Sequence, residues 1–114
     1  MSALTSRRAL LGGAAVAAAA LSLPLRDALA GPVTHEVRIK GFVFEPADLE
    51  VRIGDTVRWI NDDLAPHTAT AQEFGWDTGP LERGQTGEVT VIDGMEVDYF
   101  CVFHPHMVAR LRIV

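Results

Sequence analysis

Cysteine is nearly absent from this sequence, because Cys101 is the only one among its 114 residues. A single cysteine cannot form an internal disulfide, so a fold held by disulfides is excluded. Basic residues are also scarce: 10 Lys and Arg stand against 15 Asp and Glu, for a net charge of −5. This balance argues against a nucleic-acid partner, since binding to phosphate needs clustered Lys and Arg. The length allows one domain only, and no internal repeat or low-complexity tract follows Gly31.

The first 30 residues have the features of a secretory signal. Arg7 and Arg8 precede an apolar run over residues 9–23, and Ala28-Leu29-Ala30 forms an A-x-A cleavage site. A basic start, an apolar middle and a small-residue cleavage site are typical of signal peptides. The run is shorter than the roughly 20 apolar residues of a membrane span, and the paired arginines indicate the twin-arginine type.

We therefore expect residues 1–30 to be a twin-arginine signal peptide and residues 31–114 to be a single domain in the periplasm. Stable membrane insertion is not expected after cleavage, although retention of the apolar run as an anchor is the alternative. Without Arg7, Arg8, Arg26 and Asp27, the domain keeps 7 basic and 14 acidic residues, a net charge of −7. A basic or mixed-charge protein surface is the partner that such a charge favours.

Short runs of alternating apolar and polar residues follow one another through the mature domain, and no window has a helical period. Period-2 alternation is typical of half-buried strands. The residues expected to face the core are Val37, Ile39, Leu49, Val51, Ile53, Val57, Trp59, Val89, Val91, Val97, Tyr99, Cys101, Leu111 and Ile113. Turn signals such as Gly54-Asp55 and Asp93-Gly94 separate the runs. The pattern predicts an all-β sandwich or small barrel, in which Trp59 and Trp76 serve packing.

Soft-metal donors gather in the stretch CVFHPHM, where Cys101, His104 and Met107 have the spacing C-x-x-H-x-x-M. Thiolate and thioether donors select soft metals such as copper, and two His, one Cys and a weak axial Met make up the blue-copper set. A tight loop after a strand can wrap three donors around one ion, and Pro105 stiffens such a loop. Export strengthens the hypothesis, because an exported thiol is open to oxidation unless it is buried or occupied.

The second histidine of such a site has three candidates. His67 follows Pro66 in a loop between two expected strands, so it can approach from another part of the sandwich. His35 lies near the mature N-terminus and is interpreted as a solvated residue. His106 lies beside Pro105 on the expected outer edge of the loop and is interpreted as a surface residue that affects docking. The residues favour His67 and leave the other two open.

The stretches FVFEPADLEVRIGDTVRWINDDLAPHTAT and VDYFCVFHPHMVARLRIV resemble the cupredoxins, the small blue copper proteins, and among them the amicyanin, pseudoazurin and plastocyanin group. The resemblance covers essentially the whole mature chain. It implies a Greek-key β-sandwich of about eight strands. It also implies that His67, Cys101, His104 and Met107 bind one type 1 copper ion.

By the same resemblance, the function is the transfer of single electrons between a donor and an acceptor protein, without enzyme activity. We expect a monomer that docks transiently through an apolar patch around His104. The residues expected in that patch are Leu64, Ala65, Pro66, Phe103 and Pro105.

Two departures from the family pattern concern the surroundings of the metal. Thr68 stands where members often carry Asn, which braces the loop and bonds near the cysteine sulfur; we expect the threonine hydroxyl to replace it in part. Phe103 and His106 stand where the short-loop members have a proline and a phenylalanine.

Four other interpretations of the donor cluster remain. A copper chaperone or storage protein would use a Met-rich site, whereas only Met95 and Met107 follow the signal. A Cys–His nucleophile would need a separate base and an open cleft. A structural zinc site would accept Cys and His but does not favour a thioether. The last is a buried strand cysteine with incidental histidines.

Overall fold

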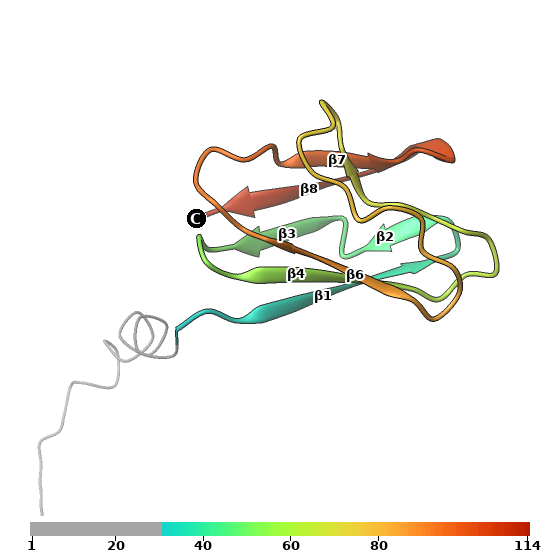
Figure 1. Cartoon of the computed structure of the whole chain (residues 1–114), viewed down its shortest axis with the longest axis horizontal. Coiled ribbons are helices and arrows are strands. Elements are labelled where there is room, and N and C mark those ends of the chain that lie inside the picture. Colours follow the sequence, from blue (N-terminus) through green and yellow to red (C-terminus); the bar gives the residue numbers. More distant parts are fainter. Residues whose placement is uncertain (1–30) are drawn as a thin grey trace, which may run out of the picture. The chain divides into compact units, whose positions relative to one another are not determined.

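The computed structural model describes residues 31–114, which form eight strands and no helix (Figure 1). The expected signal peptide lies outside the described residues. The strands are β1 (Thr34–Lys40), β2 (Val43–Glu45), β3 (Asp48–Val51), β4 (Thr56–Asn61), β5 (Thr70–Ala71), β6 (Thr86–Thr90), β7 (Asp98–Cys101) and β8 (His104–Ile113). No helix in this part of the chain is long and apolar enough to cross a membrane.

The strands form two four-stranded sheets, in the orders β2-β1-β4-β6 and β3-β8-β7-β5. The pairs β1–β4 and β3–β8 are parallel, and the other pairs are antiparallel. Because a parallel pair needs a crossover, the chain must leave one sheet and return to it, which produces the Greek-key connections of a sandwich. The all-β sandwich prediction is confirmed.

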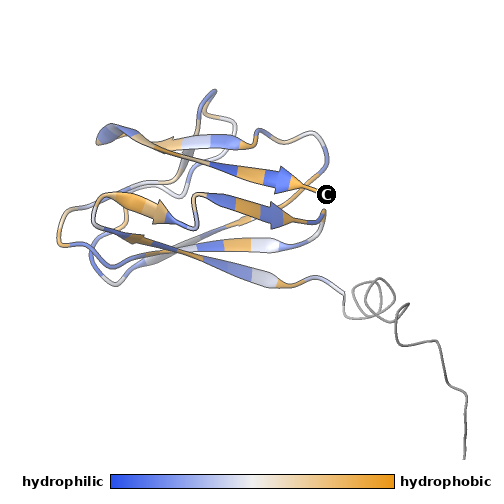
Figure 2. Ribbon diagram, turned by 180° about the vertical axis from the view of Figure 1, so that it is seen from behind, coloured by the Kyte–Doolittle hydropathy of each residue, from blue (hydrophilic) through white to orange (hydrophobic). Residues whose placement is uncertain are grey.

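The core lies between the two sheets and contains the inward residues of the alternating runs (Figure 2). Ile39, Val57 and Trp59 are fully buried from one sheet, and Tyr99 and Leu111 from the other. The alternation misleads at one expected core residue, Ile53, which is 57% exposed. Ile53 lies beyond the end of β3, in the turn that precedes β4, where the pleat no longer fixes the direction of a side chain.

Both tryptophans serve packing, as expected. Trp59 stacks on the half-buried Trp76 with ring centroids 5.5 Å apart, and both rings contact Tyr99. Burial raises the pKa of Tyr99 to about 12, so its phenol is neutral at physiological pH. Tyr99 joins this aromatic cluster to β7, the strand that ends at Cys101.

One end of the sandwich gathers the segments that carry the metal-donor candidates. Figure 1 shows the β1–β2 turn, the β4–β5 loop and the β7–β8 turn together at this end. Strand register therefore brings residues near positions 42, 67 and 101 into one neighbourhood.

Candidate metal centre

The turn between β7 and β8 places Cys101 opposite His104. The two residues are antiparallel partners, and only Val102 and Phe103 lie between them. Both cross-strand neighbours therefore present their side chains to the same small volume. The C-x-x-H spacing folds as a β-hairpin end, which differs from the free loop that the sequence suggested.

A bulge then brings Met107 to the buried side. The register of β7 with β8 changes between Phe100 and Cys101, so residues 105–107 of β8 have no partner on β7. Pro105 and His106 are consecutive exposed residues in this bulge, and Met107 is 3% exposed. Bulges redirect side chains beside functional sites. His104 and Met107 are three residues apart, so in a regular strand their side chains would point to opposite faces. The bulge allows both side chains to face inward.

His67 reaches the site from the β4–β5 loop. Its backbone forms an isolated bridge with Leu81, with N···O distances of 3.1 and 2.8 Å. The buried Asn61 side chain donates to the carbonyls of Ala65 and Leu81 and accepts from the N–H of Asp63. This amide fixes the path of the loop, so the fully buried His67 has a defined position.

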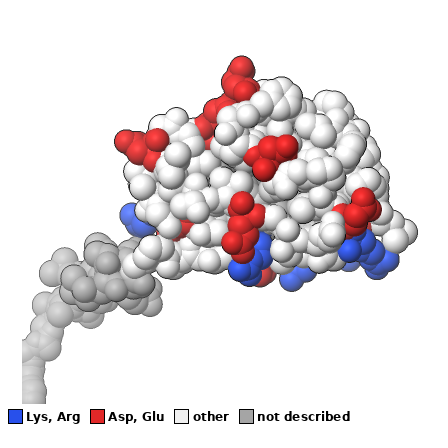
Figure 3. Space-filling model, viewed as in Figure 1, with Lys and Arg blue, Asp and Glu red and all other residues white. Residues whose placement is uncertain are grey.

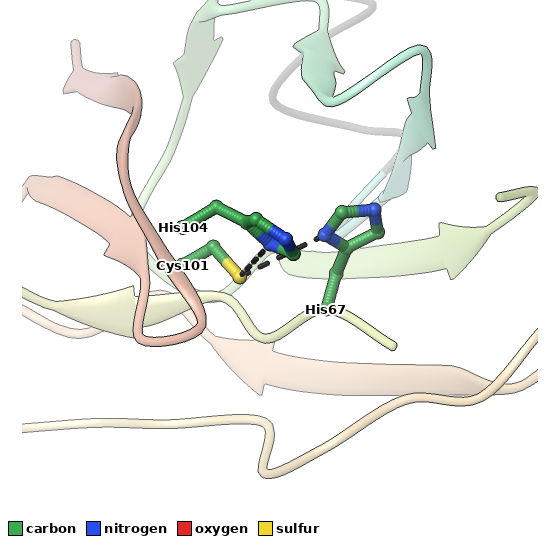
Figure 4. A group of neighbouring side chains, drawn as sticks. All are labelled: His67, Cys101 and His104. Carbon is green, nitrogen blue, oxygen red and sulfur yellow. Dashed lines mark hydrogen bonds between the residues drawn. The ribbon is translucent and has the colours of Figure 1, made fainter. Parts of the chain in front are cut away.

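Figure 4 shows the rings of His67 and His104 converging on the sulfur of Cys101. Each histidine places Nδ1 at 3.7 Å from Cys101 Sγ, and all three donor atoms lie within 4.8 Å of one another. Bonds of about 2.0 Å to nitrogen and about 2.3 Å to sulfur, at about 120°, would place N and S about 3.7 Å apart. The two nitrogen–sulfur separations are therefore suited to donors that would share one metal ion.

Asp63 defines which nitrogen of His67 is free. The carboxylate can only accept, so Nε2–H of His67 donates to Asp63 Oδ2 at 2.8 Å and Nδ1 keeps its lone pair. Burial raises the pKa of the Asp63 carboxyl, but the N–H groups of Phe42 and Gly41 and the His67 ring bring it below its usual value. The tautomer of His67 is thus suited to bind a metal through Nδ1.

Phe42 covers both histidines. Its ring lies edge-on to His67 and His104, with centroid distances of 5.1 and 4.7 Å. Gly41 and Phe42 both have positive φ in the two-residue turn between β1 and β2, as in a type I′ turn. That conformation is unfavourable for phenylalanine. Asp63 stabilises it by accepting both backbone N–H groups, at 2.8 and 3.0 Å.

Thr68 forms hydrogen bonds with Cys101 and with the residue that follows it. Its backbone N–H donates to Cys101 Sγ at 3.3 Å, and its hydroxyl accepts the N–H of Val102 at 2.9 Å. The threonine hydroxyl therefore braces the turn after Cys101, and its replacement of the family's asparagine stays a prediction.

The four histidines do not all lie where the sequence suggested. His106 is exposed, with its ring centroid 6.4 Å from that of His104, as expected for a surface residue. The solvated interpretation of His35 is wrong: its side chain is 24% exposed, and Nε2 lies 2.8 Å from Asp55 Oδ2. His67, Cys101 and His104 form the only group of three or more His, Cys, Asp or Glu metal donors found in residues 31–114.

No protein-family model matches the chain. Amicyanin from Paracoccus denitrificans is 32% identical over 82 residues, which are 68% of this chain and 63% of that protein. A variant of amicyanin, solved in the reduced Cu(I) form at pH 4, superposes with a TM-score of 0.64 at 27% identity, over 71% of this chain and 82% of that one. The chain belongs to the cupredoxins. The copper-containing nitrite reductase from Thermus scotoductus also matches this cupredoxin, with a TM-score of 0.63 and 28% identity, over 73% of this chain and 22% of the reductase.

Copper is the cofactor that fits this cupredoxin. Two imidazole nitrogens and the Cys101 sulfur lie within 4.8 Å of one another, and the buried thioether of Met107 follows on β8. Softness and geometry both suit copper in a type 1 centre. The cupredoxin spans 63% of the length of the amicyanin that it matches.

Proposed function

We propose that this cupredoxin carries single electrons between redox proteins, through one copper ion bound by His67, Cys101, His104 and Met107. When bound, copper supplies a one-electron Cu(I)/Cu(II) couple. The observation that carries the proposal is the pair of 3.7 Å separations between Cys101 Sγ and the two Nδ1 atoms. These separations fit three donors around one metal ion.

The surroundings of the donors support a carrier because they are rigid. Asn61 and Asp63 fix the position and tautomer of His67, and the β7–β8 pairing fixes Cys101 against His104. A site that changes little between two oxidation states needs donors that are already in place. Rigid donors therefore reduce the rearrangement that accompanies electron transfer.

Four protein donors also favour a carrier over an enzyme, because they leave no open metal position for a substrate. Two surface hollows of about 490 and 280 Å³ lie elsewhere, and their linings include none of the four donors. The likeness to the nitrite reductase covers 22% of that chain, so it concerns one domain of a larger protein.

His104 is the proposed point of electron exit. It is half-buried, and we define the His104 patch as Phe42, Leu64, Phe103 and Pro105, all of them exposed. Figure 3 shows no charged side chains on the upper part of this end, at the right of the view, whereas basic and acidic side chains lie together on its lower part. Apolar contacts of small area suit weak, transient redox encounters, below about 1,200 Å². The proposal includes a monomer with a separate donor and acceptor.

Electrochemistry of the copper-loaded protein tests the proposed function. We expect a reversible one-electron couple and retention of one copper per chain through repeated cycles. A copper chaperone or storage protein is the second candidate; it would instead release Cu(I) to a chelating acceptor during turnover. Loss of copper on reduction would contradict the carrier and support that candidate.

The proposal also places the protein in the periplasm, after twin-arginine export and cleavage behind Ala30. The paired arginines, the apolar run and the A-x-A site support it. N-terminal sequencing of the exported protein should begin at Gly31. A periplasmic or membrane fraction that retains the first 30 residues would contradict the cleavage.

A further inference from the structure

A chain of hydrogen bonds connects the residue after Cys101 to an exposed carboxylate on another loop. The N–H of Val102 donates to Thr68 Oγ1 at 2.9 Å. The hydroxyl oxygens of Thr68 and Thr70 are 2.8 Å apart, and Thr70 donates to Asp77 Oδ1 at 2.8 Å. Thr68 is 2% exposed and Thr70 is fully buried, whereas Asp77 is exposed.

The direction of this chain is fixed by counting protons. A hydroxyl carries one proton, and the proton of Thr70 is donated to Asp77, which can only accept as a carboxylate. The bond between the threonines must therefore use the proton of Thr68. Thr68 Oγ1 then acts toward Val102 as an acceptor, and every donor in the chain points toward Asp77.

Aligned donors reinforce one another. A hydrogen bond to an ionised acceptor is stronger than one between neutral groups, and successive bonds in a buried chain polarise each other. The negative charge of Asp77 therefore makes Thr68 Oγ1 a better acceptor for the N–H of Val102. Gly79 N–H also donates to Asp77 Oδ1, at 2.9 Å, and holds the carboxylate in place.

The chain of hydrogen bonds reaches the metal centre at Thr68. This residue follows His67, and its own N–H donates to Cys101 Sγ. The hydroxyl of Thr68, the residue after His67, accepts from the N–H of Val102, the residue after Cys101. Thr68 therefore joins the two segments that carry these metal donors. Hydrogen bonding around the cysteine sulfur is one of the factors that set the potential of a blue-copper site.

We propose that Asp77 is a positioning residue for the metal centre, which acts through Thr70 and Thr68 on the β7–β8 turn and thereby tunes the reduction potential. The inference rests on the proposed copper function. It depends on the threonine at position 68, whose hydroxyl is connected to the surface through Thr70 and Asp77.

The decisive experiment is a double-mutant cycle. Asp77→Asn keeps an oxygen that can accept from Thr70 but removes the negative charge. The reduction potential should therefore rise, which favours the reduced state. Thr70→Val breaks the chain while the charge remains. If Asp77 acts through Thr70, the shift caused by Asp77→Asn should largely disappear in the Thr70→Val background. A shift of equal size in both backgrounds would overturn the relay.

Two controls separate the relay from simple charge and from damage to the fold. Glu82→Gln also removes one negative charge. Glu82 follows Leu81, the bridge partner of His67, but within residues 31–114 no hydrogen bond links Glu82 to Thr68, Thr70 or Asp77. It should shift the potential less than Asp77→Asn does, and an equal shift would count against the relay. Thr70→Ser keeps the hydroxyl and should restore the wild-type potential.

A second readout needs no copper. Exchange of the Val102 amide proton, followed by NMR in the copper-free protein, should be about two- to tenfold faster in Asp77→Asn, as expected for one weakened hydrogen bond. Unchanged exchange in Asp77→Asn would overturn the inference, even if Thr70→Val does not fold. Absence of a copper couple in the wild-type protein would overturn the proposed function instead, while the exchange result would still decide whether the chain operates.

Discussion

Asp63 holds His67 from the side of the ring that faces away from the metal centre, with 2.8 Å between Oδ2 and Nε2. The same carboxylate accepts the N–H groups of Gly41 and Phe42. One side chain thus joins the β1–β2 turn to the β4–β5 loop and orients a metal donor. The metal centre depends on a contact between two segments more than twenty residues apart in the chain.

Replacing Asp63 should weaken copper binding. Asn at this position has one acceptor oxygen in place of two, so it cannot accept from His67 and the two backbone N–H groups together, and its NH2 group would face a donor. Loss of such a partner lowers metal affinity by about 10- to 100-fold in comparable sites. Competition against a Cu(I) chelator measures the effect. Asp62→Asn is the matched control, because Asp62 pairs with Arg38, and equal losses in both variants would contradict the role of Asp63.

Removing the ring of Phe42 should speed the loss of copper. The ring covers both histidines, so Phe42→Ala opens a path for water and chelator. We expect chelator-driven release to be several-fold faster, as followed by stopped-flow absorption. Phe74→Ala is the control: Phe74 is also an exposed aromatic residue with positive φ, but it packs on Phe100. Similar acceleration in both variants would point to general loosening of the fold.

Much of the fold followed from the sequence because strand alternation is a local signal. Val37 and Ile39, or Tyr99 and Cys101, face the core as their spacing predicts. The spacing of Cys101, His104 and Met107 indicated three of the donors, and the resemblance to the cupredoxins implied His67 as the fourth. The assignment of these four residues as copper ligands stays a prediction until copper is bound.

The surroundings of the site could not be read from the sequence. The sequence pointed to no role for Asp63 or Phe42 at the metal centre, because their contacts depend on how β1 pairs with β4. His35 was misinterpreted for a similar reason: Asp55, its partner, lies 20 residues away. Long-range pairs between polar side chains leave no periodic pattern in a sequence.

The Asp55 carboxylate should make stability depend on pH in acid. Burial raises its pKa, but His35 and the N–H groups of Val33 and Arg52 bring it below the usual value. A lowered folded pKa gives stability above the unfolded value, about 3.9, which is lost as the pH falls through the folded pKa. Urea unfolding of the copper-free protein should therefore show a loss of stability as the pH falls below about 4.

Asp55→Asn should reduce this loss and cost about 1–3 kcal/mol at pH 7, because its amide nitrogen would face donors. Asp93→Asn, in the exposed turn between β6 and β7, is expected to leave the pH profile unchanged. A profile for Asp55→Asn that matches the wild type would show that other carboxylates control acid stability.

The visible spectrum during titration with Cu(II) tests the copper site most directly. We expect an intense band near about 600 nm that saturates at about one copper per chain, is retained in His106→Ala and is lost in Cys101→Ser. No such band in the copper-loaded wild type, or the same band in Cys101→Ser, would contradict a type 1 copper centre at Cys101.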